Sequence, residues 1–216
     1  LVANPSPASP MKASPDFPPT LPSPGEFLFS ETSYAVDMDI LPILQSRKIL
    51  ILCASRSDRE TVSVLTAELA LRGQVTVLDG GNRFQAYRVA QLLRQKTTQV
   101  NSTAKNIFIR RAFTCYQILA LLEGTPNLRQ PFIIMDLLAT FYDEHVSTNE
   151  ARRLLGLCLR EIDRLRQFAP VLVALAPPLL PDRSFLIDLV CARADQVLAH
   201  EMPLAVPSQL TLFPVY

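Results

Sequence analysis

The chain has 216 residues, 49% of them hydrophobic, which suffices for one domain with a proper core and argues against wholesale disorder. Its 21 basic and 20 acidic residues leave a formal net charge of +1, so no global field draws the chain toward nucleic acid or anionic membrane. Four scattered cysteines without a C-x-x-C pair, and only two histidines, predict reduced thiols of a cytoplasmic protein rather than a metal site.

The first 42 residues are predicted to be a tail and lead-in rather than part of the folded domain. Residues 1 to about 26 hold eight of the eighteen prolines, so neither a helix nor a strand ladder can propagate there. These prolines also stand where a signal peptide would need its apolar core. No apolar run in the chain is long enough to span a bilayer, so no membrane association is expected.

Residues 43–200 are predicted to form one α/β domain, because apolar runs of strand length alternate with segments of helical periodicity. Such alternation implies crossovers, and therefore a mostly parallel sheet with helices on both faces. The predicted strands are 48–54, 75–79, 106–110, 132–136, 171–175 and 195–199, and the predicted helices are 59–72, 84–94, 113–123 and 148–168.

The turn between the first strand and the first helix is the first place to look for a ligand, because sheets of this kind bind ligands beyond the carboxyl ends of their strands. The turn has the spacing of a phosphate-binding loop, G-x-x-x-x-G-K-[ST], but none of the residues that define this motif. Cys53 and Asp58 replace the two glycines, Arg59 replaces the lysine, and Glu60 replaces the magnesium-binding hydroxyl residue. Two interpretations stay open: the acids only cap the helix, or Arg59 and Thr61 retain a residual nucleotide site. ATP hydrolysis is not expected.

Three later stretches resemble the RecA superfamily, especially its archaeal and eukaryotic strand-exchange proteins. They are VLDGGNRF at 77–84, NIFIRRAFTCYQ at 106–117, and FIIMDLLATFY at 132–142, which is similar to the Walker B strand and its following loop. The resemblance implies a RecA-like core of the P-loop NTPase type with a degenerate P-loop. The family's catalytic glutamate falls on Gly81, and Asp136 is left either as a remnant of the magnesium site or as a turn residue.

The resemblance therefore implies a paralogue that has kept the fold and lost the ATPase, as in the ImuA-type and SulA-type relatives. The proline-rich segment 176–184 is also unlike the long DNA-binding loop of an active recombinase. No cofactor and no metal are expected, although residual binding of ATP and magnesium through Arg59, Thr61 and Asp136 stays open.

The C-terminal segment 201–216 contains QLTLF, which resembles the pentapeptide that binds the bacterial sliding clamp. In that interpretation Leu212 and Phe213 fill a hydrophobic pocket while Gln209, followed by Leu210, fixes the register. The same residues fit the eukaryotic and archaeal clamp motif less well. They could instead form a final edge strand that packs on the domain.

Arg153, Arg160 and Arg164 share one face of the long helix and are a candidate DNA-binding patch, or else a solvated helix face. The leading hypothesis is a non-catalytic accessory protein of DNA repair or replication. It would bind the sliding clamp and a repair polymerase or a recombinase-family partner, and would touch DNA indirectly if at all, in the cytoplasm at the nucleoid. The alternatives are an atypical nucleotide-binding ATPase and a structural subunit of a larger complex, joined through its sheet edge or basic helix.

Overall fold

The computed structural model describes residues 40–53, 58–178 and 181–199. The strands are β1 (Ile49–Cys53), β2 (Val75–Asp79), β3 (Ile107–Arg111), β4 (Phe132–Met135), β5 (Val171–Leu175) and β6 (Gln196–Ala199). The helices are α1 (Asp58–Arg72), α2 (Ala86–Lys96), α3 (Val100–Ala104), α4 (Cys115–Glu123), α5 (Thr148–Arg166) and α6 (Phe185–Cys191), with 3-10 helices η1 (Ala139–Tyr142) and η2 (Pro181–Arg183). The predicted alternation of strands and helices is confirmed.

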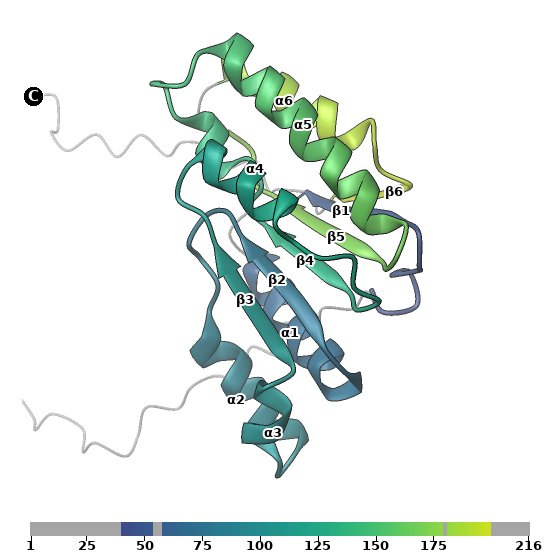
Figure 1. The fold of residues 1–216 in the computed structure, drawn as a ribbon. Coiled ribbons are helices and arrows are strands. Elements are labelled where there is room, and N and C mark those ends of the chain that lie inside the picture. The colour runs from purple at the N-terminus through teal and green to yellow at the C-terminus, as the bar shows by residue number, and fades with distance from the viewer. Residues whose placement is uncertain (1–39, 54–57, 179–180, 200–216) are drawn as a thin grey trace, which may run out of the picture. The chain divides into compact units, whose positions relative to one another are not determined.

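The six strands form one parallel sheet in the order β3-β2-β4-β5-β1-β6 (Figure 1). The prediction of a mostly parallel sheet is therefore confirmed and sharpened. β1 lies between the two strands that come last in the chain, so Ile51 stands opposite both Val173 and Val197. β3 and β6 form the two edges of the sheet.

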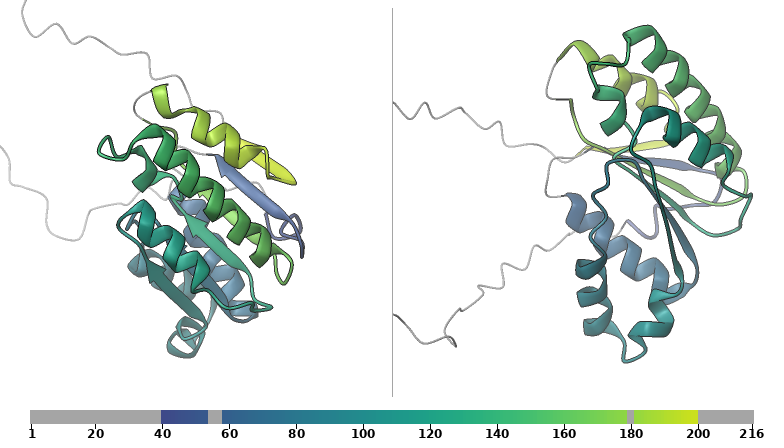
Figure 2. Two further views of the ribbon diagram at one scale, coloured as in Figure 1. Left: turned by 45° about the horizontal axis from the view of Figure 1, so that its top comes forward. Right: turned by 60° about the vertical axis from the view of Figure 1, so that its left-hand side comes forward.

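Helices cover both faces of the sheet, as the two views of Figure 2 show. One face packs against α4, α5 and α6, which bury Leu122, Leu155 and Leu186 completely. The other face packs against α1, α2 and α3, where Ala67 and Leu93 are wholly buried. Burial of apolar side chains on both faces explains why the central strands read as continuous apolar runs.

Two helix starts show how local sequence sets the boundaries. Ser147 precedes α5 and its hydroxyl accepts a hydrogen bond from Glu150 N, while Thr114 does the same for Gln117 N at the start of α4. Such caps satisfy backbone N–H groups that have no partner within the helix. Ile40, from the predicted lead-in, is buried against the α1 side of the sheet.

Two described helices were not predicted. α3 is a five-residue turn of helix after α2, and α6 directly follows the proline-rich segment 176–184. No described helix has both the length and the apolar character needed to cross a bilayer. The N-terminal tail up to residue 39 and the C-terminal segment 201–216 lie outside the described residues.

Candidate functional site at the carboxyl edge of the sheet

Parallel pairing brings the carboxyl ends of β1, β2 and β4 to the same edge of the sheet. From β2 the chain passes to α2 on one face, whereas from β4 it passes to α5 on the opposite face. The two strands are neighbours, so the chain changes face between them. Crevices of open α/β sheets form at such switch points, which makes the ends of β2 and β4 the candidate site.

Asp79 closes β2 and is completely buried. Its Oδ1 accepts hydrogen bonds from Gly81 N (3.2 Å) and Arg83 N (3.0 Å), and its Oδ2 accepts one from Phe84 N (2.9 Å). Arg111 Nε, from the neighbouring strand, lies 3.4 Å from the same Oδ2. One carboxylate thus orders the whole turn after β2, because backbone N–H donors and a guanidinium share its two oxygens.

Asp136 follows β4 and lies opposite this turn. Its φ of 50° is in the left-handed region, which aspartate tolerates better than most residues. The side chain is largely buried, Arg83 Nε lies 3.9 Å from Oδ2, and this oxygen has no hydrogen-bond partner among the described residues. Burial raises the pKa of Asp136; Arg83 and then Arg59 oppose that shift, and Asp79 adds to it.

The two glycines after Asp79 allow the turn to lie close against Ile118 and Asp136. A Cβ on Gly80 would lie 2.6 Å from Ile118 Cδ1, and a Cβ on Gly81 would lie 2.7 Å from both Cβ and Oδ2 of Asp136. In the resemblance to the RecA superfamily, Gly81 stands at the position of that family's catalytic glutamate. In this chain the space for that side chain is taken by Asp136.

Of the residues at the P-loop-like turn, 54–57 lie outside the described part of the chain. Glu60 is oriented toward α2, where its carboxylate receives hydrogen bonds from Arg88 Nε (2.9 and 3.0 Å) and Nη2 (2.5 Å). This pairing raises the pKa of Arg88 and fastens α1 to α2, so Glu60 does more than cap a helix. Thr61 is buried.

The structure therefore brings two of the three predicted cofactor residues into one electrostatic neighbourhood. Arg59 is close enough to Asp136 to oppose the rise in the pKa of that carboxyl, while Thr61 makes no such contribution. The residues do not fit a magnesium site. Both oxygens of Asp79 already accept N–H groups, arginines stand where a divalent cation would be repelled, and no cluster of three ligand side chains occurs among the described residues.

The predicted DNA-binding face of α5 is partly engaged in ion pairs within the domain. Arg153 donates to both oxygens of Glu150, at 2.8 and 2.7 Å. Arg160 is exposed. Paired charge on an exposed helix face offers less attraction to a phosphate backbone than free charge does.

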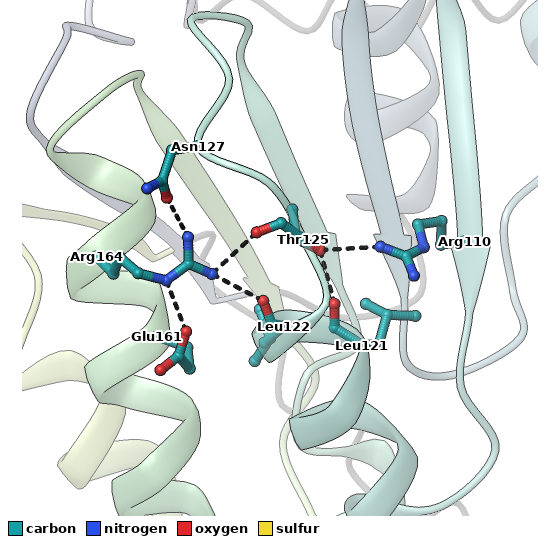
Figure 3. A network of polar contacts seen from close by, with 7 residues as sticks. All are labelled: Arg110, Leu121, Leu122, Thr125, Asn127, Glu161 and Arg164. Carbon is teal, nitrogen blue, oxygen red and sulfur yellow. Dashed lines mark hydrogen bonds and ion pairs between the residues drawn. The ribbon is translucent and has the colours of Figure 1, made fainter.

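Arg164 takes part in a network that closes the end of α4 (Figure 3). Its Nη2 donates to the backbone oxygens of Leu122 and Thr125, both at 3.0 Å, its Nε donates to Glu161, and its Nη1 donates to Asn127. From the other side, Arg110 Nη1 donates to Gly124 O at 3.0 Å. Carbonyl oxygens at the C-terminus of a helix attract cations, and two arginines hold this terminus through them. DNA binding by the three arginines stays a prediction.

The edge formed by β3 differs from the interior of the sheet, because its residues from Phe108 to Arg111 are all exposed. Phe108 and Ile109 keep 45% and 39% of their surface, and Phe113, just beyond the strand, keeps 62%. Asn106 O accepts from Val75 N, and Ala112 N donates to Asp79 O. Since backbone groups alternate along a strand, those of residues 107, 109 and 111 face away from the sheet.

Sequence reasoning identified Asp136 and Arg59 but missed Asp79, Arg83 and Arg111 as members of the same cluster. The one signal in the sequence was that Asp79 and Arg83 stand on either side of the two glycines in a RecA-like stretch. The clamp-binding candidates Gln209, Leu210, Leu212 and Phe213 lie outside the described residues. In comparisons with protein-family models and with curated proteins, no family model and no curated protein matches this chain.

Proposed function

We propose that this chain is a non-catalytic, RecA-like accessory protein of DNA repair or replication that binds a protein partner and the sliding clamp. The three RecA-like stretches support it, because they contribute to neighbouring strands and their ends. The position of the catalytic glutamate is a glycine packed on Asp136, and Glu60 is committed to Arg88. Both features support a scaffold rather than an ATPase.

The observation that carries the partner-binding part is the open edge of β3. Phe108, Ile109 and Phe113 are exposed there, beside backbone groups that face away from the sheet. An extended segment of a partner can add a strand to such an edge, with its main chain providing hydrogen bonds and its side chains covering the apolar surface. The basic helix is a weaker candidate, since Arg153 and Arg164 are paired within the domain.

A matched pair of phenylalanine variants tests this edge. Phe108→Asp is expected to abolish binding to a repair polymerase or recombinase-family partner, measured by calorimetry with the purified partner. Phe168→Asp is the control, because Phe168 is similarly exposed (42%) but follows α5, outside the edge. Equal binding by both variants would remove the β3 edge from the proposal.

The clamp-binding part is tested separately, with the full chain and purified bacterial sliding clamp. Truncation after Pro207, or the double change Leu212→Ala and Phe213→Ala, is expected to weaken binding at least about tenfold, because apolar anchors dominate peptide interfaces. Leu204→Ala, upstream of the motif, is the control. An intact, folded chain that does not bind the clamp would exclude this partner and leave a RecA-like scaffold.

A second candidate function, an atypical nucleotide-binding protein, is favoured by the cluster around Asp136. Arg59 replaces the P-loop lysine and influences the pKa of that carboxyl, whose Oδ2 has no hydrogen-bond partner among the described residues. If ATP binds there, the melting temperature must rise with ATP concentration, because a ligand of the folded state alone stabilises it. Arg59→Ala should remove the shift and exposed Arg72→Ala should keep it. A flat response of the unmodified chain would exclude the nucleotide.

A further inference from the structure

Two of the four cysteines meet, although 138 positions separate them in the chain. Cys53 is the last residue of β1 and Cys191 is the last residue of α6. Their Sγ atoms lie 3.9 Å apart, in van der Waals and weak hydrogen-bonding contact. Cys115 and Cys158 are buried, whereas Cys53 and Cys191 are only partly buried. Cys53 and Cys191 are therefore the two less buried of the four cysteines.

The two sulfurs are close enough to form a disulfide after a small movement of their side chains. A disulfide bond is about 2.05 Å long, so the two sulfurs must approach by roughly 2 Å, which is within the range of side-chain rotation. The pair has too few ligands for a zinc site, which takes four donors, and no cluster of three metal-binding side chains occurs in the described ranges. Reversible oxidation is then the chemistry left to two adjacent, partly accessible thiols.

We propose that Cys53 and Cys191 form a dithiol site that low-molecular-weight disulfides, such as oxidised glutathione, convert to an intramolecular disulfide. One protein thiolate attacks the small disulfide, which forms a mixed disulfide and releases one small thiolate. The second protein sulfur then attacks the mixed disulfide, which forms the Cys53–Cys191 bond and releases the second small thiolate. The two protein thiols are oxidised, the small disulfide is reduced to two thiols, and the two released protons pass to the departing thiolates.

The surroundings of Cys53 weaken it as a nucleophile. Burial, followed by the neighbouring Cys191, raises the pKa of Cys53 to about 12, so Cys53 stays a thiol at neutral pH. Because the thiolate is the attacking species, the exchange is expected to speed up as the pH rises. Cys191 lies at the end of α6, where it is partly exposed.

The bond would connect the first strand of the sheet to its last described helix. Cys53 is also the first residue of the P-loop-like turn, so oxidation would anchor the start of that turn to α6. A crosslink between segments this far apart removes much freedom from the unfolded chain. The oxidised protein is therefore expected to melt at a higher temperature than the reduced protein, and this rise should disappear on reduction.

The test treats the full, folded chain with oxidised glutathione and blocks the remaining thiols before digestion and mass spectrometry. The expected result is a loss of two hydrogen masses and a Cys53–Cys191 linked peptide, with a melting temperature higher by about 5 °C or more. Cys115→Ala should form the same bond. A folded chain without this linked peptide, or with links to Cys115 or Cys158, would overturn the proposal.

Single variants test whether both sulfurs are needed. Cys53→Ser and Cys191→Ser should each fail to form the intramolecular bond, and neither should gain the rise in melting temperature, because no second sulfur is present to resolve a mixed disulfide. Circular dichroism establishes that both variants are folded, and the same variants in denaturant should react at every remaining thiol. A rise in the melting temperature of either single variant on oxidation would contradict the proposal.

Discussion

The turn after β2 and the edge of β3 belong to neighbouring strands, but the turn buries a polar group whereas the edge exposes apolar side chains. After β2, one buried carboxylate receives three backbone N–H groups and an arginine, and two glycines pack against the chain. Along β3, aromatic and aliphatic side chains are exposed and backbone groups face away from the sheet. The difference separates residues that hold the fold together from residues available to a partner, and the RecA-like stretches contain both kinds.

Asp79→Ala should break the first half of this comparison and have the largest effect on stability. Removing the carboxylate leaves three N–H donors and Arg111 without their acceptor, which should lower the free energy of unfolding by about 3 kcal/mol. Urea unfolding, monitored by circular dichroism, measures this change in the free energy of unfolding. The exposed Glu144→Ala provides a matched acidic control. A near-neutral Asp79→Ala would show that the buried carboxylate serves a site rather than the fold.

Gly81→Glu places a glutamate where the proposed RecA-like resemblance expects the catalytic one, and it should be the next most destabilising change. Its Cβ would lie 2.7 Å from Asp136, so the loss should be about 2 kcal/mol, and no ATP hydrolysis should appear. Thermal unfolding and phosphate release measure the two outcomes. Gly156→Ala in α5, where a Cβ meets nothing within 4 Å, should instead stabilise the chain by about 0.5 kcal/mol. Measurable hydrolysis by Gly81→Glu would contradict the scaffold interpretation.

Arg164→Ala should cost about 1–2 kcal/mol, because the α4 terminus loses two hydrogen bonds to its carbonyls. Arg153→Ala should change the unfolding midpoint by no more than the error of the measurement, since its pair with Glu150 is solvent-exposed. Urea unfolding compares the two variants under identical conditions. If Arg153→Ala weakens DNA binding while Arg164→Ala does so only through unfolding, the basic face of α5 divides into one functional and one structural arginine.

Asp136→Asn should have a small effect whose size depends on pH. Since the folded-state pKa of Asp136 is raised, the folded protein holds the proton more tightly, so stability is lost as pH rises from the ordinary aspartate range through the folded pKa. The asparagine side chain removes that loss and tolerates the positive φ, so the variant should be slightly more stable than the parent at neutral pH and lose this advantage in acid. The difference in melting temperature between the variant and the parent, measured from roughly pH 4 to pH 7, tests this expectation, because that range begins at the ordinary aspartate pKa. Asp136→Ala, strained at this φ, should be less stable than Asp136→Asn at every pH.

The sheet was predictable because its central strands are buried on both faces and therefore carry continuous apolar runs. α6 was not, since it is short and follows prolines that favour a loop, and α3 is shorter still. Local sequence patterns also could not predict the order of the strands, because that order depends on which distant segments pair.

The candidate site was predictable only in part, because it also depends on contacts between distant segments. Residue type and position pointed to Asp136, but not to its positive φ or to Gly81 packing against it. Helical spacing placed Arg164 beside Arg160, yet spacing along one helix says nothing about the neighbouring helix terminus that Arg164 holds. The contact between Cys53 and Cys191 likewise depends on the tertiary fold alone.

The position of β1 in the sheet has a consequence for how the chain is made. Of the described strands, β1 is synthesised first, but both of its neighbours in the sheet, β5 and β6, are synthesised after β2, β3 and β4. Until residue 171 emerges, neither of the described strands that pair with Ile49–Cys53 has been made, while β2, β3 and β4 can already assemble. Non-local pairing of this kind is slow and leaves an aggregation-prone strand exposed. A nascent chain stalled before β5 should therefore depend on chaperones, and release of the last strands should end that dependence.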